Sequence, residues 1–242
     1  MRKLPIVSVI ANILLVGYIL INLATTNSNN YQWKAEECLK GWTNSLYSLR
    51  DTVDIVFLGN SITYGGLFEA EFSDKRICNL GYPSDDLCGM TERINQVMAL
   101  HPAKVFLMGG INGLTNQDLN DFENEYETLV KSLKDSMPLT VIYLQSILPV
   151  NKAIKNINVP SCQKIIEANG IIEQISRKYK CRYINLYPLY AEDNILPNRY
   201  TADGVHLLPN AYKMWFQVIK DYVYEQTFKR KGYHHPAAVD SR

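Results

Sequence analysis

Four short segments of the sequence carry residue types that together could perform acyl transfer. Ser61 follows an apolar run, and Asp203 and His206 stand three residues apart near the end of the chain. A serine hydroxyl becomes an effective nucleophile when an imidazole takes its proton and a carboxylate orients that imidazole. The remaining two segments, around Gly81 and Asn112, are rich in glycine, which lets the backbone approach a ligand closely.

Each segment has a simpler interpretation when it is taken alone. A serine just after a strand is commonly a helix N-cap. An isolated aspartate and histidine three residues apart are commonly a helix cap and a hydrogen-bonded histidine, and any sharp strand-to-helix turn uses glycine. The conjunction of all four segments favours the chemical interpretation, because acyl transfer needs these residue types at once.

The elements that must position these residues alternate along the chain. From about residue 51, short β-rich runs alternate with helical patterns, which is typical of an α/β domain with a mainly parallel sheet. We expect strands at 53–58, 76–80, 104–108, 140–144 and 182–186, and helices at about 86–100, 118–135, 161–179 and 210–226. Ligands in such folds bind outside the carboxyl ends of the strands, and the four segments follow strands directly.

Together, the four segments resemble the blocks of the GDSL/SGNH hydrolase family, over roughly residues 53–226. That family supplies serine, glycine, asparagine and histidine from its four blocks, with an aspartate three residues before the histidine. The pattern is most similar to the platelet-activating-factor acetylhydrolase-like and bacterial carbohydrate-esterase branch. The resemblance implies a three-layer α/β/α flavodoxin-like fold with a five-stranded parallel sheet, and an esterase that uses an acyl-enzyme and no cofactor.

Transferred to this chain, the family pattern implies a role for each matching residue. Ser61 would be the nucleophile, His206 its general base and later acid, and Asp203 the carboxylate that stabilises the imidazolium. The oxyanion hole would consist of the backbone N–H groups of Ser61 and Gly81 and the side-chain amide of Asn112.

Two positions depart from the family pattern. The first segment reads GNSI where the family has GDSL, and the third reads GING where GxND is usual, so that Asn60 and Gly113 replace acidic residues. Neither position is an acid, a base or an oxyanion donor in this scheme. The departures therefore bear on the substrate class more than on the reaction type.

The first residues of the chain predict a membrane segment. Residues 4–24 are apolar apart from three polar side chains, and as a helix they would span about 30 Å, the thickness of a bilayer core. Because Arg2 and Lys3 precede this stretch, we expect a cytoplasmic N-terminus and an exported domain, anchored or secreted after cleavage. The predicted organisation is a signal anchor or signal peptide (1–26), a tether (27–50), an SGNH-hydrolase-like domain (51–228) and a flexible tail (229–242).

Composition excludes several other classes of function. With 25 basic and 24 acidic residues the net charge is +1, far from the basic excess that nucleic-acid binding requires. The five cysteines are scattered and contain no CxxC pair, and His234 and His235 have no other ligand at a suitable spacing, so we expect no metal site.

The expected function is an exported serine esterase that removes a short acyl group, such as acetate, from a glycan or a small ester. Three alternatives stay open: a lysophospholipase or thioesterase, an O-acyltransferase acting on an envelope polymer, and a non-catalytic glycan-binding protein. The sequence leaves the oligomeric state open.

Overall fold

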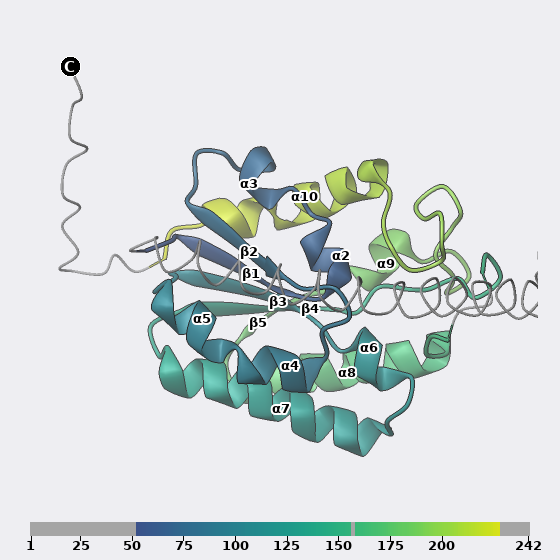
Figure 1. The fold of residues 1–242 in the computed structure, drawn as a ribbon, viewed down its shortest axis with the longest axis horizontal. Coiled ribbons are helices and arrows are strands. Elements are labelled where there is room, and N and C mark those ends of the chain that lie inside the picture. The colour runs from purple at the N-terminus through teal and green to yellow at the C-terminus, as the bar shows by residue number, and fades with distance from the viewer. Residues whose placement is uncertain (1–51, 156–157, 228–242) are drawn as a thin grey trace, which may run out of the picture. The chain divides into compact units, whose positions relative to one another are not determined.

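A parallel β-sheet forms the centre of the structure, which is a computed structural model describing residues 52–155 and 158–227. Within these residues the sheet has five strands: β1 (Ile55–Gly59), β2 (Ile77–Gly81), β3 (Lys104–Met108), β4 (Val141–Gln145) and β5 (Arg182–Ile184). Their order is β2-β1-β3-β4-β5, and all neighbours pair in parallel. The predicted α/β fold with a five-stranded parallel sheet is thereby confirmed (Figure 1).

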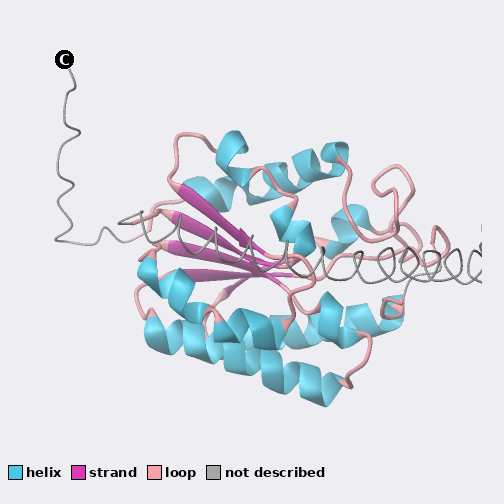
Figure 2. Ribbon diagram, in the orientation of Figure 1, coloured by secondary structure: helices cyan, strands magenta, loops and turns pink. Residues whose placement is uncertain are grey.

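Helices cover both faces of the sheet. The described helices are α2 (Ser61–Tyr64), α3 (Phe68–Glu71), α4 (Leu87–Glu92), α5 (Ile94–Ala99), α6 (Ile111–Leu114), α7 (Leu119–Ser136), α8 (Cys162–Lys178), α9 (Tyr187–Tyr190) and α10 (Pro209–Tyr224). Helices α4 to α8 lie on one side of the sheet, and α2, α3, α9 and α10 lie on the other (Figures 1 and 2). The result is a three-layer arrangement in which every strand but those at the edges is covered twice.

The longer helices follow from their hydrophobic periodicity and their caps. In α7 the buried positions recur every three or four residues, and the Asp118 carboxylate accepts a hydrogen bond from the Asp121 N–H at 2.8 Å. Ser161 caps α8 in the same way through the Lys164 N–H. Sequence and structure agree on these two helices to within one residue at each end.

An aromatic cluster fixes the position of α10 on the sheet. Phe57 of β1 stacks on Phe68 and Phe106, with ring centroids 3.8 and 4.9 Å apart. Trp215 of α10 meets Phe68 edge to face and is fully buried. Its indole N–H donates to Gln145 Oε1 at 2.7 Å, so the buried polar groups of α10 and β4 satisfy each other. Helix α10 matters because the loop leading into it carries Asp203 and His206.

Three features differ from the sequence-based expectation. The helix predicted at 86–100 is broken at Arg93, which ends α4 and begins α5 with a non-helical ψ of 17°. Strand β5 ends at Ile184, because the N–H groups of Leu186 and Tyr187 donate to the Ser146 hydroxyl oxygen instead of continuing a strand ladder. The four-residue helices α2, α3, α6 and α9 were not predicted, since so short a segment shows no periodicity.

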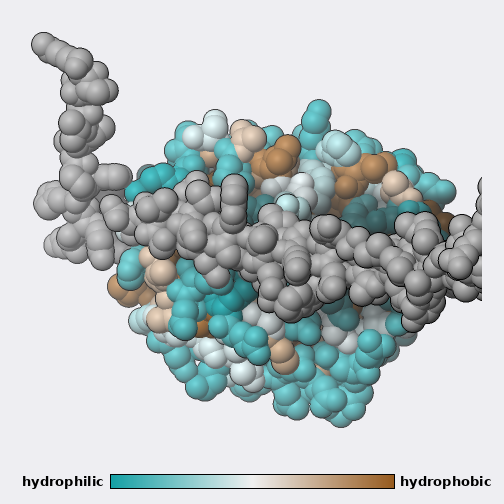
Figure 3. Space-filling view, viewed as in Figure 1, coloured by the Kyte–Doolittle hydropathy of each residue, from teal (hydrophilic) through white to brown (hydrophobic). Residues whose placement is uncertain are grey.

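The predicted membrane segment (1–26), tether (27–50) and tail (229–242) lie outside the described residues. Among residues 52–155 and 158–227, none of the helices combines the length and the apolar character needed to cross a bilayer. Large exposed apolar side chains are few there, and on the face in Figure 3 hydrophobic residues form separate patches between hydrophilic ones.

Candidate active site

The position of Ser61, the predicted nucleophile, is created by the turn from β1 into α2. Asn60 is the N-cap of α2, and its side-chain oxygen accepts a hydrogen bond from the Ile62 N–H at 3.0 Å. Ser61 is therefore the first helical residue, at the carboxyl edge of the sheet. Asn60 is 1% exposed, so the neutral amide caps this buried turn without placing a charge there. This explains physically how GNSI can replace GDSL in the first segment.

The structure brings Ser61, His206 and Asp203 into one hydrogen-bonded chain. The Ser61 Oγ lies 2.9 Å from His206 Nε2, and His206 Nδ1 lies 2.7 Å from Asp203 Oδ2. Because a carboxylate only accepts, the tautomer consistent with both contacts has Nδ1–H donating to Asp203 and Nε2 accepting from the serine hydroxyl. In that tautomer His206 can remove the hydroxyl proton as Ser61 attacks.

The second oxygen of Asp203 is held by its own loop. Asp203 Oδ1 accepts hydrogen bonds from the Val205 and His206 N–H groups at 2.9 and 2.8 Å. Burial by itself would raise the pKa of Asp203, but the hydrogen bonds from the His206 ring and from these two N–H groups outweigh it and hold the pKa well below its usual range. Asp203 therefore stays ionised wherever an imidazole titrates and can stabilise an imidazolium beside it.

Thr201 is a further residue of this loop that sequence reasoning missed. Its hydroxyl lies 3.3 Å from Asp203 Oδ1, and its oxygen accepts from the Gly204 N–H at 2.9 Å. Gly204 has a φ of 92°, a left-handed conformation that suits glycine. The sequence Thr-Ala-Asp-Gly is typical of a side-chain-stabilised turn, and this signal could have identified Thr201.

Asn112 lies at the start of α6, where its side chain is exposed and oriented by one hydrogen bond. Its Nδ2 donates to the backbone oxygen of Asp85 at 2.7 Å. An amide nitrogen carries two hydrogens, so one stays available for a ligand. The turn before Asn112 needs glycine at position 110, where φ is 110°. A Cβ added at Gly110 would lie 2.6 Å from the Phe122 ring.

Gly81 has a structural role at the contact between α2 and β2. Its N–H donates to the Asn79 side-chain oxygen at 2.9 Å, so this amide is already engaged. A Cβ at Gly81 would lie only 2.2 Å from the Tyr64 backbone nitrogen, and the Asn79 amide also binds the carbonyls of Thr63 and Gly66. Gly81 and Asn79 thus pack α2 against β2. The role of Gly81 as an oxyanion donor stays a prediction, as do the roles of the Ser61 N–H and the Asn112 amide.

No metal centre is evident in the described part of the chain. Across residues 52–155 and 158–227, the His, Cys, Asp and Glu side chains form no group of three that could hold a metal ion. The cysteines described, Cys78, Cys88, Cys162 and Cys181, form no disulfide among themselves.

Comparison with known proteins places this site in a family. The model of the GDSL-like Lipase/Acylhydrolase family matches residues 57–214, which contain Ser61, Gly81, Asn112, Asp203 and His206. A search of the curated proteins finds no match.

Solved structures show the same fold. A protein from Streptococcus pneumonia, provisionally described as a platelet activating factor, is 25% identical with a TM-score of 0.74, over 84% of this chain and 99% of that one. A GDSL-like lipase from Bacteroides thetaiotaomicron VPI-5482 is 24% identical with a TM-score of 0.65, over 80% and 97% of the two chains. An acetyl xylan esterase is 19% identical with a TM-score of 0.60, over 71% and 100%. With the family model matching more than half of its length, the chain belongs to the GDSL-like lipase/acylhydrolase family and is an ester hydrolase.

Proposed function

We propose that this ester hydrolase is a serine esterase in which Ser61, His206 and Asp203 form the catalytic triad. The observation that carries the proposal is the unbroken hydrogen-bonded path from Ser61 Oγ through the His206 ring to Asp203. These residues come from opposite ends of the described chain and meet where the parallel strands end. A serine, an imidazole and a carboxylate in this order are what acyl transfer requires.

The reaction would proceed in two halves. His206 Nε2 takes the proton of Ser61 as Oγ bonds to the ester carbonyl carbon, and the oxyanion is stabilised by the Ser61 N–H and the Asn112 amide. The imidazolium then gives its proton to the departing alcohol, which leaves an acyl-enzyme. Because the His206 side chain is 50% exposed, water can reach it and lose a proton to Nε2 as the water oxygen bonds to the acyl carbon. The bond from the acyl carbon to Ser61 Oγ then breaks, Oγ takes the proton back from the imidazolium, and the acid is released.

The first prediction concerns Ser61. We expect a fluorophosphonate probe to label the wild-type protein and not Ser61→Ala, with esterase activity falling roughly 10⁴-fold or more in the variant. Mass spectrometry of the labelled peptide and hydrolysis of p-nitrophenyl acetate are the measurements. Thr63→Ser, which keeps a buried hydroxyl two residues away, should retain labelling. Equal labelling of wild type and Ser61→Ala would disprove the triad.

The second prediction concerns Asn112. Replacing it with alanine removes a donor that acts on developing charge, so kcat should fall by about 10²–10³ with KM nearly unchanged. Asn112 is exposed, and the substitution should leave the melting temperature close to that of the wild type. Steady-state kinetics with p-nitrophenyl acetate would measure both constants. A kcat within twofold of wild type would remove Asn112 from the oxyanion hole.

For the substrate, we propose short acyl esters, with acetylated carbohydrate as the natural class. Asn60 and Ile62, the sequence neighbours of Ser61, line a hollow of about 170 Å³ that has no room for a water molecule. It is closed by buried apolar side chains, among them Ile111, Ile147 and Leu148. A long acyl chain would find no cavity there in which to bury its methylenes, whereas an acetyl group needs none.

The third prediction tests this acyl preference. Wild-type kcat/KM should fall at least about 10-fold from p-nitrophenyl acetate to the octanoate. Ile147→Ala enlarges the hollow and should raise the butyrate-to-acetate ratio of kcat/KM, while Ile172→Ala, an equal truncation in the core under α8, should not. A wild-type preference that rises with chain length would refute the short-acyl proposal.

We also propose that the domain is exported and held at the membrane by residues 4–24. The support comes from the sequence: an uncharged apolar stretch long enough to span a bilayer, preceded by Arg2 and Lys3. In cells expressing the full chain, the protein should sediment with membranes and be digested by protease added outside the cytoplasmic membrane. Protection from that protease in intact cells, with digestion after lysis, would contradict export.

A further inference from the structure

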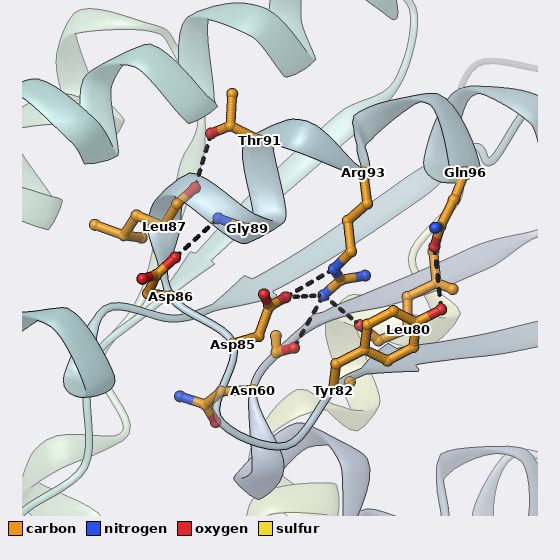
Figure 4. A network of polar contacts seen from close by, with 12 residues as sticks. Asn60, Leu80, Tyr82, Asp85, Asp86, Leu87, Gly89, Thr91, Arg93 and Gln96 are labelled. Atoms are coloured by element: carbon orange, nitrogen blue, oxygen red, sulfur yellow. Dashed lines mark hydrogen bonds and ion pairs between the residues drawn. The ribbon is translucent and has the colours of Figure 1, made fainter. Parts of the chain in front are cut away.

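Behind the candidate oxyanion hole lies a buried ion pair between Arg93 and Asp85. Both residues are 8% exposed, and Arg93 Nε and Nη2 each lie 2.7 Å from Asp85 Oδ2. Figure 4 shows the Arg93 side chain reaching from the break between α4 and α5 toward Asp85. A buried charge is costly unless it is paired and hydrogen-bonded, so this guanidinium is held in place by its acceptors.

The same guanidinium binds the ends of two strands. Arg93 Nη2 donates to the carbonyl of Gly59 at 3.1 Å and to that of Leu80 at 2.9 Å. Gly59 is the last residue of β1, and Ser61 follows two residues later. One planar, rigid group therefore sets the spacing between the strand that delivers the nucleophile and its neighbour β2.

Arg93 also holds the turn that orients Asn112. The Tyr82 ring lies against the guanidinium, 4.2 Å from Cζ to the ring centroid, and the Tyr82 hydroxyl donates to Gln96. The turn from Tyr82 to Asp85 includes Ser84 at a φ of 60°, an unusual value for a residue with a side chain. Because the Asp85 carboxylate is fixed by Arg93, its backbone oxygen is fixed too, and that oxygen accepts from Asn112.

We propose that Arg93, acting with Asp85, is a positioning residue for the oxyanion hole. It sets the place of the Asn112 amide through the Asp85 carbonyl and the place of Ser61 through the Gly59 carbonyl. Arg93 itself touches neither substrate nor reacting atoms. The proposal rests on the proposed function, because it takes Asn112 and Ser61 as the groups that face the substrate.

A substitution at Gly89 gives a second way to disturb the contact between Arg93 and Asp85. A Cβ at Gly89 would lie 2.2 Å from Asp85 Oδ1, so the carboxylate occupies the space that any other residue's side chain would fill. Gly89 lies within α4, where alanine is otherwise the better helix former. The methyl group of Gly89→Ala would therefore displace the Asp85 carboxylate without removing a charge or a hydrogen-bonding group from the site.

The experiment compares Arg93→Lys and Gly89→Ala with wild type on p-nitrophenyl acetate. Lysine keeps the charge but cannot bind Asp85 and two carbonyls in one plane. For each variant kcat should fall about 10- to 100-fold at nearly constant KM, since a misplacement of about 1 Å can cost on the order of 10²-fold. Arg76→Lys is the matched control: Arg76 pairs with Asp54 at the opposite ends of β1 and β2, and its kcat should stay at the wild-type value.

Coupling to Asn112 separates positioning from a general loss of structure. In an Asn112→Ala background the donor that Arg93 orients is absent, so the part of the Arg93→Lys effect that acts through Asn112 should disappear and the two losses in kcat should be less than additive in free energy. If a variant merely lowers the folded fraction, its fold loss in kcat and that of Asn112→Ala would multiply in the double variant. Melting curves check that each protein is folded at the assay temperature, and Gly89→Ala provides the same test if Arg93→Lys does not fold.

The outcomes distinguish this inference from the function on which it rests. If Asn112→Ala lowers kcat but Arg93→Lys and Gly89→Ala keep wild-type values, the positioning role is wrong and the triad stands. If their losses are fully additive with that of Asn112→Ala, the role through Asn112 is likewise overturned. Unaltered labelling of Ser61→Ala would instead remove the proposed triad itself.

Discussion

The contact between Ser61 Oγ and His206 Nε2 is the interaction on which the proposed function depends, and it joins residues 145 positions apart in the sequence. The segments that carry Ser61 and His206 are both held by local hydrogen bonds. Ser61 begins a helix capped by the buried Asn60, and His206 is tied to Asp203 by both its ring and its backbone N–H. Each side chain is thus held by hydrogen bonds within its own segment as well as by their mutual contact. Such preorganisation lets the site stabilise charge without reorganising during the reaction.

The core of the domain keeps these two local structures at the right separation. On one side of the sheet, stacked aromatic rings join β1 to Phe68, and Trp215 joins Phe68 to α10. The Trp215 indole also bonds to Gln145 at the end of β4. Asn151 then links the chain after β4 to the catalytic loop, since its N–H donates to the Gly204 carbonyl at 2.8 Å. A packed interior transmits such constraints because it is dense and deforms little.

On the other side of the sheet, a buried ion pair between Arg93 and Asp85 links several elements. Arg93 is buried, and its carbonyl and carboxylate acceptors come from β1, β2 and the turn after β2. Removing water from such a group is costly, but the resulting bonds are directional and strong. The Gly59 carbonyl, two residues before Ser61, and Asp85, whose backbone oxygen holds the Asn112 amide, therefore share contacts with one guanidinium, while the loop of His206 leads into α10, which packs in the aromatic core. Two different kinds of interaction thus meet at the carboxyl edge of the sheet.

The sequence by itself determined the fold class, the approximate ranges of the five strands and of the longer helices, and the residue types of the proposed triad. Strands buried on both faces appear in a sequence as continuous apolar runs and helices as apolar periodicity, and the chemistry needs few side-chain types. Strand β3 was predicted at its observed bounds, 104–108. Only the tertiary structure decided that the Gly81 amide binds Asn79, that Arg93 interrupts a predicted helix to reach two strand ends, and that Thr201 braces Asp203. Each of these depends on which backbone groups of separate turns come within hydrogen-bonding distance, and no periodicity along the chain encodes that distance.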